Sequence, residues 1–165
     1  MNNTGNWPSK LLFLMIFTSV LTQAGCTTPS TQPQKAFAKL DDLGLIFESD
    51  HSWLKVGETV HMRFTITNNG SRTWVVESKN FPVLDIIVQD VNSGQLLLSW
   101  SAQNPDKVSH RVEWKPGESK MLELTWTAAE SNFGHLVHTG GLLLQNSGIN
   151  QSASVSVCVG YEICH

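Results

Sequence analysis

The chain has 165 residues, of which 41% are hydrophobic and only 15% are charged, so it contains enough apolar side chains for one folded domain. Eleven Lys and Arg residues stand against fourteen Asp and Glu residues, which gives a formal net charge of -3. This balance supplies no positive surface for a phosphate backbone, and we therefore expect no nucleic-acid partner.

An apolar run without charge occupies residues 11–21. It is shorter than the roughly 20 residues that span a bilayer as a helix, and it is typical of a signal peptide. Two small residues, Ala24 and Gly25, precede Cys26, the arrangement at which a lipoprotein signal peptidase cuts. We predict that residues 1–25 are removed and that lipid on Cys26 anchors the protein to the outer face of the cell membrane. The alternative is ordinary secretion with an unmodified cysteine.

Residues 26–40 begin as a stretch of Thr, Pro and Gln with little to bury, and we predict a flexible tether there, followed by one domain over residues 41–165. Export also matters for the two remaining cysteines, Cys158 and Cys164, because the compartment outside the membrane can be oxidising. We predict that these two form a disulfide at the end of the domain. Two free thiols in a frayed tail are the alternative.

Alternation of apolar and polar residues dominates the chain from residue 41 onward. It is clearest in residues 58–67, where every second side chain is apolar, and Asn68-Asn-Gly-Ser71 then predicts a hairpin turn. Lys115-Pro-Gly-Glu118 predicts a type II turn. The expected strands cover residues 41–47, 58–67, 72–77, 84–88, 96–100, 122–126, 135–145 and 152–158.

About eight or nine short strands separated by turns, with no helical stretch of useful length, predict an all-β fold built as a two-sheet sandwich. Trp74, Trp100 and Trp126 are in phase with the aliphatic residues of their strands, so we place them in the core. Trp53 and Trp114 lie near strand ends and are candidates for exposed aromatic contacts.

The sequence contains no Gly-x-Ser-x-Gly elbow, no Gly-rich phosphate loop and no His-Glu-x-x-His helix. His135 and His138 are three apart on a predicted strand, so they point to opposite faces and cannot share a metal ion. We therefore predict that the protein is not an enzyme and uses no metal or other cofactor.

Several short motifs occur in one order over about residues 43–157. They are Val56-Gly57-Glu58, Phe64-Thr-Ile-Thr-Asn68, Val88-Gln-Asp90 followed by Gly94, Leu98-Ser-Trp-Ser101, and Pro116-Gly117-Glu118-Ser119 with Leu124-Thr-Trp126. In this order and at these spacings the chain resembles the BsuPI-type intracellular proteinase inhibitor domain. The resemblance implies an immunoglobulin-like β-sandwich that inhibits serine proteases by binding rather than by chemistry.

An inhibitor needs a contact loop on a rigid scaffold, and residues 101–111 form the longest polar connection between predicted strands. We take Asp106, Lys107 and Arg111 in this segment as candidate partner-binding residues; a solvated crossover between sheets is the alternative. The predicted function is a membrane-anchored, extracytoplasmic binding module whose protein partner is a serine protease. The rival hypothesis is a structural or adhesion module of the cell envelope that inhibits nothing.

Overall fold

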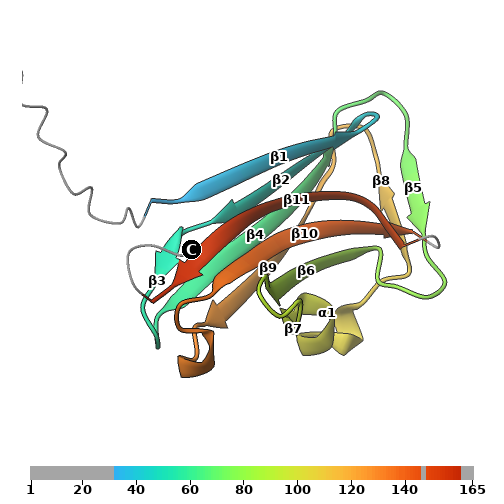
Figure 1. Ribbon diagram of the computed structural model, residues 1–165. Helices are drawn as coiled ribbons and strands as arrows, with labels where there is room; N and C mark the ends of the chain where they lie inside the picture. The colour runs from blue at the N-terminus through green and yellow to red at the C-terminus, as the bar shows by residue number, and fades with distance from the viewer. Residues whose placement is uncertain (1–31, 146–147, 161–165) are drawn as a thin grey trace, which may run out of the picture.

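The computed structural model describes residues 32–145 and 148–160, which fold into two packed β-sheets and a separate two-stranded ribbon (Figure 1). Helical structure in this part of the chain is limited to single turns. The predicted all-β sandwich is therefore confirmed. The described residues contain eleven strands, somewhat more than the eight or nine expected.

The first sheet has four antiparallel strands. In spatial order they are β1 (Gln34–Leu40), β2 (Leu43–Ser49), β4 (Thr59–Asn68) and β9 (Ser119–Thr127). The alternation read from the sequence holds in β4, where Val60, Met62, Phe64 and Ile66 are buried. The intervening side chains lie on the outer face of the sheet.

The second sheet has five strands, all antiparallel to their neighbours except the short β3, which is parallel to β11. In spatial order they are β3 (Trp53–Leu54), β11 (Gly148–Val159), β10 (Leu136–Gln145), β6 (Leu84–Asp90) and β7 (Leu96–Ser99). Two side-chain bonds join its β11 strand to β1 of the first sheet. Gln34 Nε2 donates to the Ser156 carbonyl at 2.9 Å, and Gln151 Nε2 donates to the Lys39 carbonyl at 2.9 Å.

The predicted hairpin after β4 is wrong. The returning strand β5 (Trp74–Glu77) pairs with β8 (Arg111–Trp114) instead, in a ribbon of its own. The reason is that β2 and β9 already occupy both edges of β4. The buried Asn68 side chain turns the chain away, since its Nδ2 donates to the Arg72 carbonyl at 2.7 Å and to the Trp114 carbonyl at 3.0 Å.

The predicted tether ends earlier than expected, because Gln34–Leu40 forms β1. Ala36, Ala38 and Leu40 pack against the core from one face of this strand, and Lys35 and Phe37 lie on the other face. Small alanine side chains give a weak apolar signal in the sequence, and β2 supplies the pairing that orders them. The first residues of the tether, up to residue 31, lie outside the described residues.

The core lies between the two sheets and includes Phe64, Ile86, Leu124 and the predicted core residue Trp126. Trp114 is fully buried, with 0% of its surface exposed, so its prediction as an exposed aromatic is wrong. Its position at the end of β8 does not expose it, because its side chain packs into the core beside that of its register partner Trp74. Trp53, Trp74 and Trp100 are half-buried.

A close approach between the sheets depends on Gly141 of β10. A Cβ atom at this position would lie 2.1 Å from Cγ of the Phe64 ring on β4. Gly141 therefore leaves the space that the ring of the opposite sheet fills, which lets the two sheets pack at this point. Within residues 32–145 and 148–160, no helix has the length and apolarity needed to span a bilayer.

Candidate functional site

A groove of about 680 Å³ crosses the outer face of the four-stranded sheet. It is lined from one side of the sheet to the other by Pro33 before β1, by Glu48, Ser49 and Asp50 at the end of β2, by His61, Met62 and Arg63 of β4, by Glu123, Leu124 and Thr125 of β9, and by Gln103 and Asn104. This order follows the order of the strands, so the groove runs across them rather than along one of them.

The pairing register identifies the floor of the groove. Ser49, Met62 and Leu124 are register partners on adjacent strands, and their side chains are buried. They therefore present main chain rather than side chains to the groove. The floor is the paired backbone of the sheet, and the walls are the outward-pointing side chains of the rows on either side.

One wall is a row of alternating charges. Lys35, Glu48, Arg63 and Glu123 are register partners across all four strands. Lys35 Nζ lies 2.7 Å from Glu48 Oε1, and Arg63 Nη2 lies 2.8 Å from Glu123 Oε1. These side chains are well exposed, so the pairs contribute little to stability and stay accessible to a partner.

The opposite wall consists of Asp50, His61 and Thr125. Asp50 Oδ1 accepts a hydrogen bond from the His61 main-chain N–H at 2.8 Å, and it also lies 2.7 Å from His51 Nδ1. The carboxylate is thereby held at the rim of the groove. Three carboxylates, those of Glu48, Asp50 and Glu123, line the groove with the guanidinium of Arg63, and the Lys35 ammonium at the end of the charged row pairs with Glu48, so the groove keeps a small excess of negative charge.

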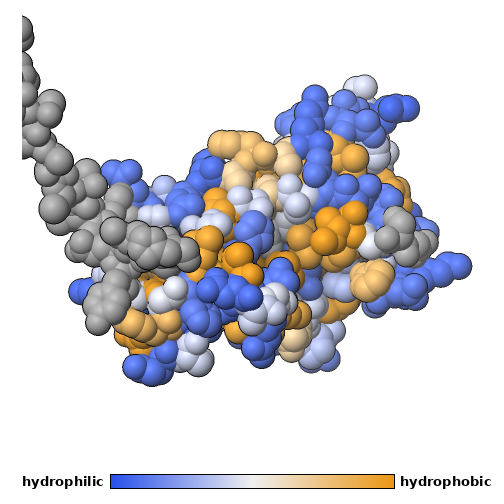
Figure 2. All heavy atoms as spheres, viewed as in Figure 1, coloured by the Kyte–Doolittle hydropathy of each residue, from blue (hydrophilic) through white to orange (hydrophobic). Residues whose placement is uncertain are grey.

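An apolar row runs beside the charged row on the same face. Phe37, Ile46, Thr65 and Met121 are register partners, and the outer two are exposed, Phe37 by 69% and Met121 by 53%. Figure 2 shows a hydrophobic patch over the middle of β1. Exposed apolar side chains next to a groove favour a contact surface over a merely solvated face.

The predicted contact segment, residues 101–111, is largely helical. It contains α1 (Trp100–Gln103), capped by the Ser99 side chain, and the 3₁₀ turn η1 (Pro105–Lys107). Trp100 thus begins a helical turn, and not the end of a strand as the sequence predicted.

This segment meets the groove at its β9 end. Asn104 lines the groove, and its Oδ1 accepts a hydrogen bond from Lys107 Nζ at 3.3 Å. The exposed residues Asp106 and Lys107 therefore adjoin the groove rather than forming a separate extended loop.

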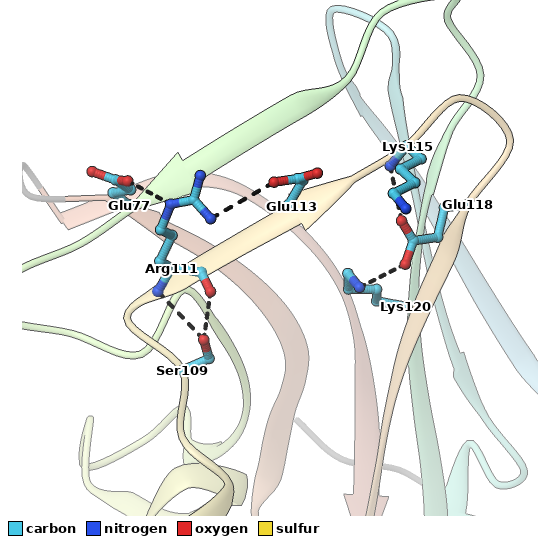
Figure 3. Close-up of polar contacts among 7 residues, drawn as sticks. All are labelled: Glu77, Ser109, Arg111, Glu113, Lys115, Glu118 and Lys120. Atoms are coloured by element: carbon cyan, nitrogen blue, oxygen red, sulfur yellow. Dashed lines mark hydrogen bonds and ion pairs between the residues drawn. The ribbon is translucent and has the colours of Figure 1, made fainter.

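The third candidate, Arg111, does not line the groove. It lies on β8, where its Nε is 2.8 Å from Glu77 Oε1 and its Nη1 is 3.7 Å from Glu113 Oε2 (Figure 3). Of the three predicted contact residues, only Lys107 contacts a residue of the groove lining, and Arg111 lies in a cross-strand ion pair of the ribbon.

The same view shows how Glu118 closes the predicted turn (Figure 3). Its carboxylate accepts the Lys115 main-chain N–H at 2.8 Å and pairs with Lys120 Nζ at 2.7 Å. The Lys120 hydrogen bond and then the Lys115 N–H lower the pKa of the Glu118 carboxyl. Gly117 has a positive φ of 75°, as a type II turn requires, so this cluster is structural.

A second cluster joins β6 to the start of β10. The carboxylate of Asp90 is buried and hydrogen-bonds both the Ser93 main-chain N–H and His135 Nδ1. These two contacts, the first being the larger, lower the pKa of Asp90 to about 2. Within the described part of the chain, no group of three His, Cys, Asp or Glu residues is arranged to hold a metal ion.

The cysteine predictions fall mostly outside the described residues. Cys158, near the end of β11, is disulfide-bonded. Its expected partner Cys164 lies beyond residue 160, and the expected lipid-bearing residue Cys26 precedes residue 32. The pairing with Cys164 and the lipidation of Cys26 stay predictions.

The residues that form the groove walls were not identified from the sequence. Glu48, Asp50 and Glu123 are far apart along the chain, and only the pairing of β2, β4 and β9 brings them together. The sequence did carry one signal, because the alternation of apolar and polar residues along β2 and β9 places Glu48 and Glu123 on the outer face of the sheet.

No family model and no curated protein matches the chain. Among solved structures, the chain is similar to the CARDB domain of PF1109 from Pyrococcus furiosus, at 16% identity over 72% of this chain and 94% of that one, with a TM-score of 0.44. It is also similar to Spo0M, a sporulation control protein from Bacillus subtilis, at 13% identity over 74% of this chain and 51% of that one, with a TM-score of 0.49. The two packed sheets of this chain form a β-sandwich.

Proposed function

We propose that the protein is a membrane-anchored, extracytoplasmic binding module that holds a protein partner in the groove on its outer sheet face. The observation that carries this proposal is the groove itself, with a main-chain floor, charged walls and two neighbouring exposed apolar side chains, Phe37 and Met121. Such a surface offers hydrogen bonds, charge and apolar contact together, as protein interfaces do.

The proposed anchor would keep the groove close to the membrane. Pro33, which lines the groove, is seven positions after Cys26. An extended chain of that length spans at most about 25 Å. A lipid on Cys26 would therefore hold the module next to partners that are exported through, or attached to, the same membrane.

The specific activity that we propose is inhibition of a serine protease by binding, which rests on the resemblance to the BsuPI-type domain. The contact surface would be the groove together with the adjoining helical turns that carry Asp106 and Lys107. Since those turns are not extended, they would flank the protease cleft rather than enter it as a substrate-like loop.

Titration of the purified exported protein against a panel of serine proteases tests this activity. We expect residual protease activity to fall stoichiometrically and to saturate, and Asp106→Ala with Lys107→Ala to weaken inhibition without changing thermal unfolding. Failure to slow any protease at micromolar concentration would favour the structural or adhesion module of the envelope. Turnover of a substrate by the pure protein would contradict both functions.

Membrane fractionation tests the anchor. Cys26→Ser should release the protein from membranes or leave the signal peptide uncut, because the thiol that accepts the lipid is gone. Incorporation of a labelled fatty acid into the unaltered chain is the positive control. A Cys26→Ser protein that is still processed, labelled and membrane-bound would refute lipidation at this residue.

A further inference from the structure

Building on the proposed function, we infer that the groove binds an extended segment of the partner protein that carries Lys or Arg side chains. Three features of the groove lead to this partner chemistry: its dimensions, its main-chain groups and the sign of its charge.

The dimensions suit a short extended peptide. Adjacent strands lie about 4.8 Å apart, so the outer two of four strands are separated by about 14 Å. The groove continues past β9 to Asn104. An extended chain rises about 3.3 Å per residue. The four strands therefore accommodate about four residues of a crossing chain, and the groove extends further to Asn104.

The β9 end of the groove offers main-chain hydrogen bonds. In the pairing of β4 with β9, Ala128 N–H donates to the Glu58 carbonyl and Asn68 N–H donates to the Glu118 carbonyl. The main-chain N–H and C=O groups of the even-numbered β9 residues therefore point toward β4. The main-chain groups of Glu123 and Thr125 consequently point away from β4. Within the described residues β9 borders no further strand, so these groups are available to the part of a crossing chain that reaches the β9 edge.

The charge of the groove lining indicates which sign of charge the partner segment carries. Three carboxylates and one guanidinium line the groove, and that guanidinium, on Arg63, is already engaged by Glu123. Glu48 is likewise paired with Lys35 at 2.7 Å, so Asp50 on the opposite wall is the lining carboxylate without a Lys or Arg partner among the described residues, and a cationic side chain of the partner would meet it there. A polyanion would gain no net attraction along this path, because carboxylates outnumber the cationic groups of Lys35 and Arg63.

The composition of the lining also argues against a sugar ligand. Carbohydrate sites usually stack a sugar ring on a Trp, Tyr or Phe side chain, and the twelve lining residues include none of these. The amides of Gln103 and Asn104 and the hydroxyl of Thr125 are equally suited to a peptide main chain. The combination of exposed carboxylates and backbone groups fits a basic polypeptide segment.

The test uses the full exported protein and three fluorescent hexapeptides, blocked at both ends, that alternate serine with lysine, glutamine or glutamate. Fluorescence anisotropy should show the lysine peptide binding at least tenfold more tightly than the glutamate peptide, with the glutamine peptide between them. Raising the salt concentration from 50 to 500 mM should weaken the binding of the lysine peptide, since salt screens the exposed charges. Equal affinity for all three peptides, or tighter binding of the glutamate peptide, would overturn the inference.

A matched pair of double variants locates the site. The double variant Glu48→Gln with Glu123→Gln removes two carboxylates from the groove and should lower the affinity for the lysine peptide about tenfold. Glu77→Gln with Glu130→Gln removes two exposed carboxylates elsewhere and should change its affinity less than twofold. Equal effects of the two double variants would show that only net charge matters and would refute the groove as the site.

The outcomes separate this inference from the proposed function. If a serine protease is inhibited but the lysine peptide does not bind, the inference is wrong and the binding module stands. If the lysine peptide binds in the groove with the expected dependence on Glu48 and Glu123 while no protease is inhibited, the inference holds and the proposed protease partner is wrong.

Discussion

Gly141→Ala probes the closest contact between the two sheets. The new methyl group would lie 2.1 Å from Cγ and 2.2 Å from Cδ2 of the Phe64 ring, well inside van der Waals contact. Phe64 is only 1% exposed, so its ring cannot swing into solvent to make room. Without the clash, replacing glycine by alanine would stabilise the domain by about 0.4 to 1 kcal/mol, because alanine lowers the conformational entropy of the unfolded chain. Overpacking a dense core costs about 1 to 3 kcal/mol, and this short distance points to the upper end.

We therefore expect Gly141→Ala to lower the free energy of unfolding by about 2 kcal/mol in a urea titration followed by tryptophan fluorescence. Phe64→Leu supplies the control, because a smaller side chain leaves room for the methyl group. In that background Gly141→Ala should cost less than about 1 kcal/mol, which gives a coupling energy of at least about 1 kcal/mol. A Gly141→Ala protein as stable as the unaltered chain, or more stable, would refute the packing argument.

Trp126→Ala should destabilise the domain by about 3 to 5 kcal/mol in denaturant titration, since the side chain is buried in the core; a loss below about 1 kcal/mol would contradict that placement. Acid should also destabilise the fold through Asp90. Its pKa falls from 3.8 to about 2 on folding, so the carboxylate stabilises the domain above pH 4 and this contribution is lost as the pH falls toward 2. The shift corresponds to at most about 2 kcal/mol, reduced by solvent near the sheet edge. Asp90→Asn should flatten this part of the stability curve, and an unchanged acid dependence in Asp90→Asn would assign it to other groups.

The strand pattern determined much of the fold before any tertiary contact was known. The alternation in residues 58–67 identified the buried face of β4 correctly, because a strand directs successive side chains to opposite faces whatever it pairs with. The turn at Lys115-Pro-Gly-Glu118 was also predictable, since Gly117 adopts the positive φ that the turn type demands. These features depend on local geometry alone.

Partner choice between strands was decided only by the tertiary structure. The sequence around Asn68 suits a hairpin, yet β4 already has two neighbours, and the buried Asn68 amide directs the chain to a separate ribbon. Trp114 was misplaced for the same reason, because its burial depends on what lies over β8 and not on its position near a strand end. β1 was missed because small alanines become core residues only when a second strand pairs beside them.

The groove is the clearest case of a feature that the sequence alone could not locate. The alternation within each strand places its wall residue on the outer face of the sheet. Many residues on that face contact only solvent, so the alternation does not distinguish the wall residues from them. Glu48, Arg63 and Glu123 form one row because β2, β4 and β9 are neighbours in a particular register, although β4 and β9 are more than fifty residues apart in the chain. Alternation fixes the face of a side chain, whereas register fixes its neighbours, and register follows from the closure of the whole sandwich.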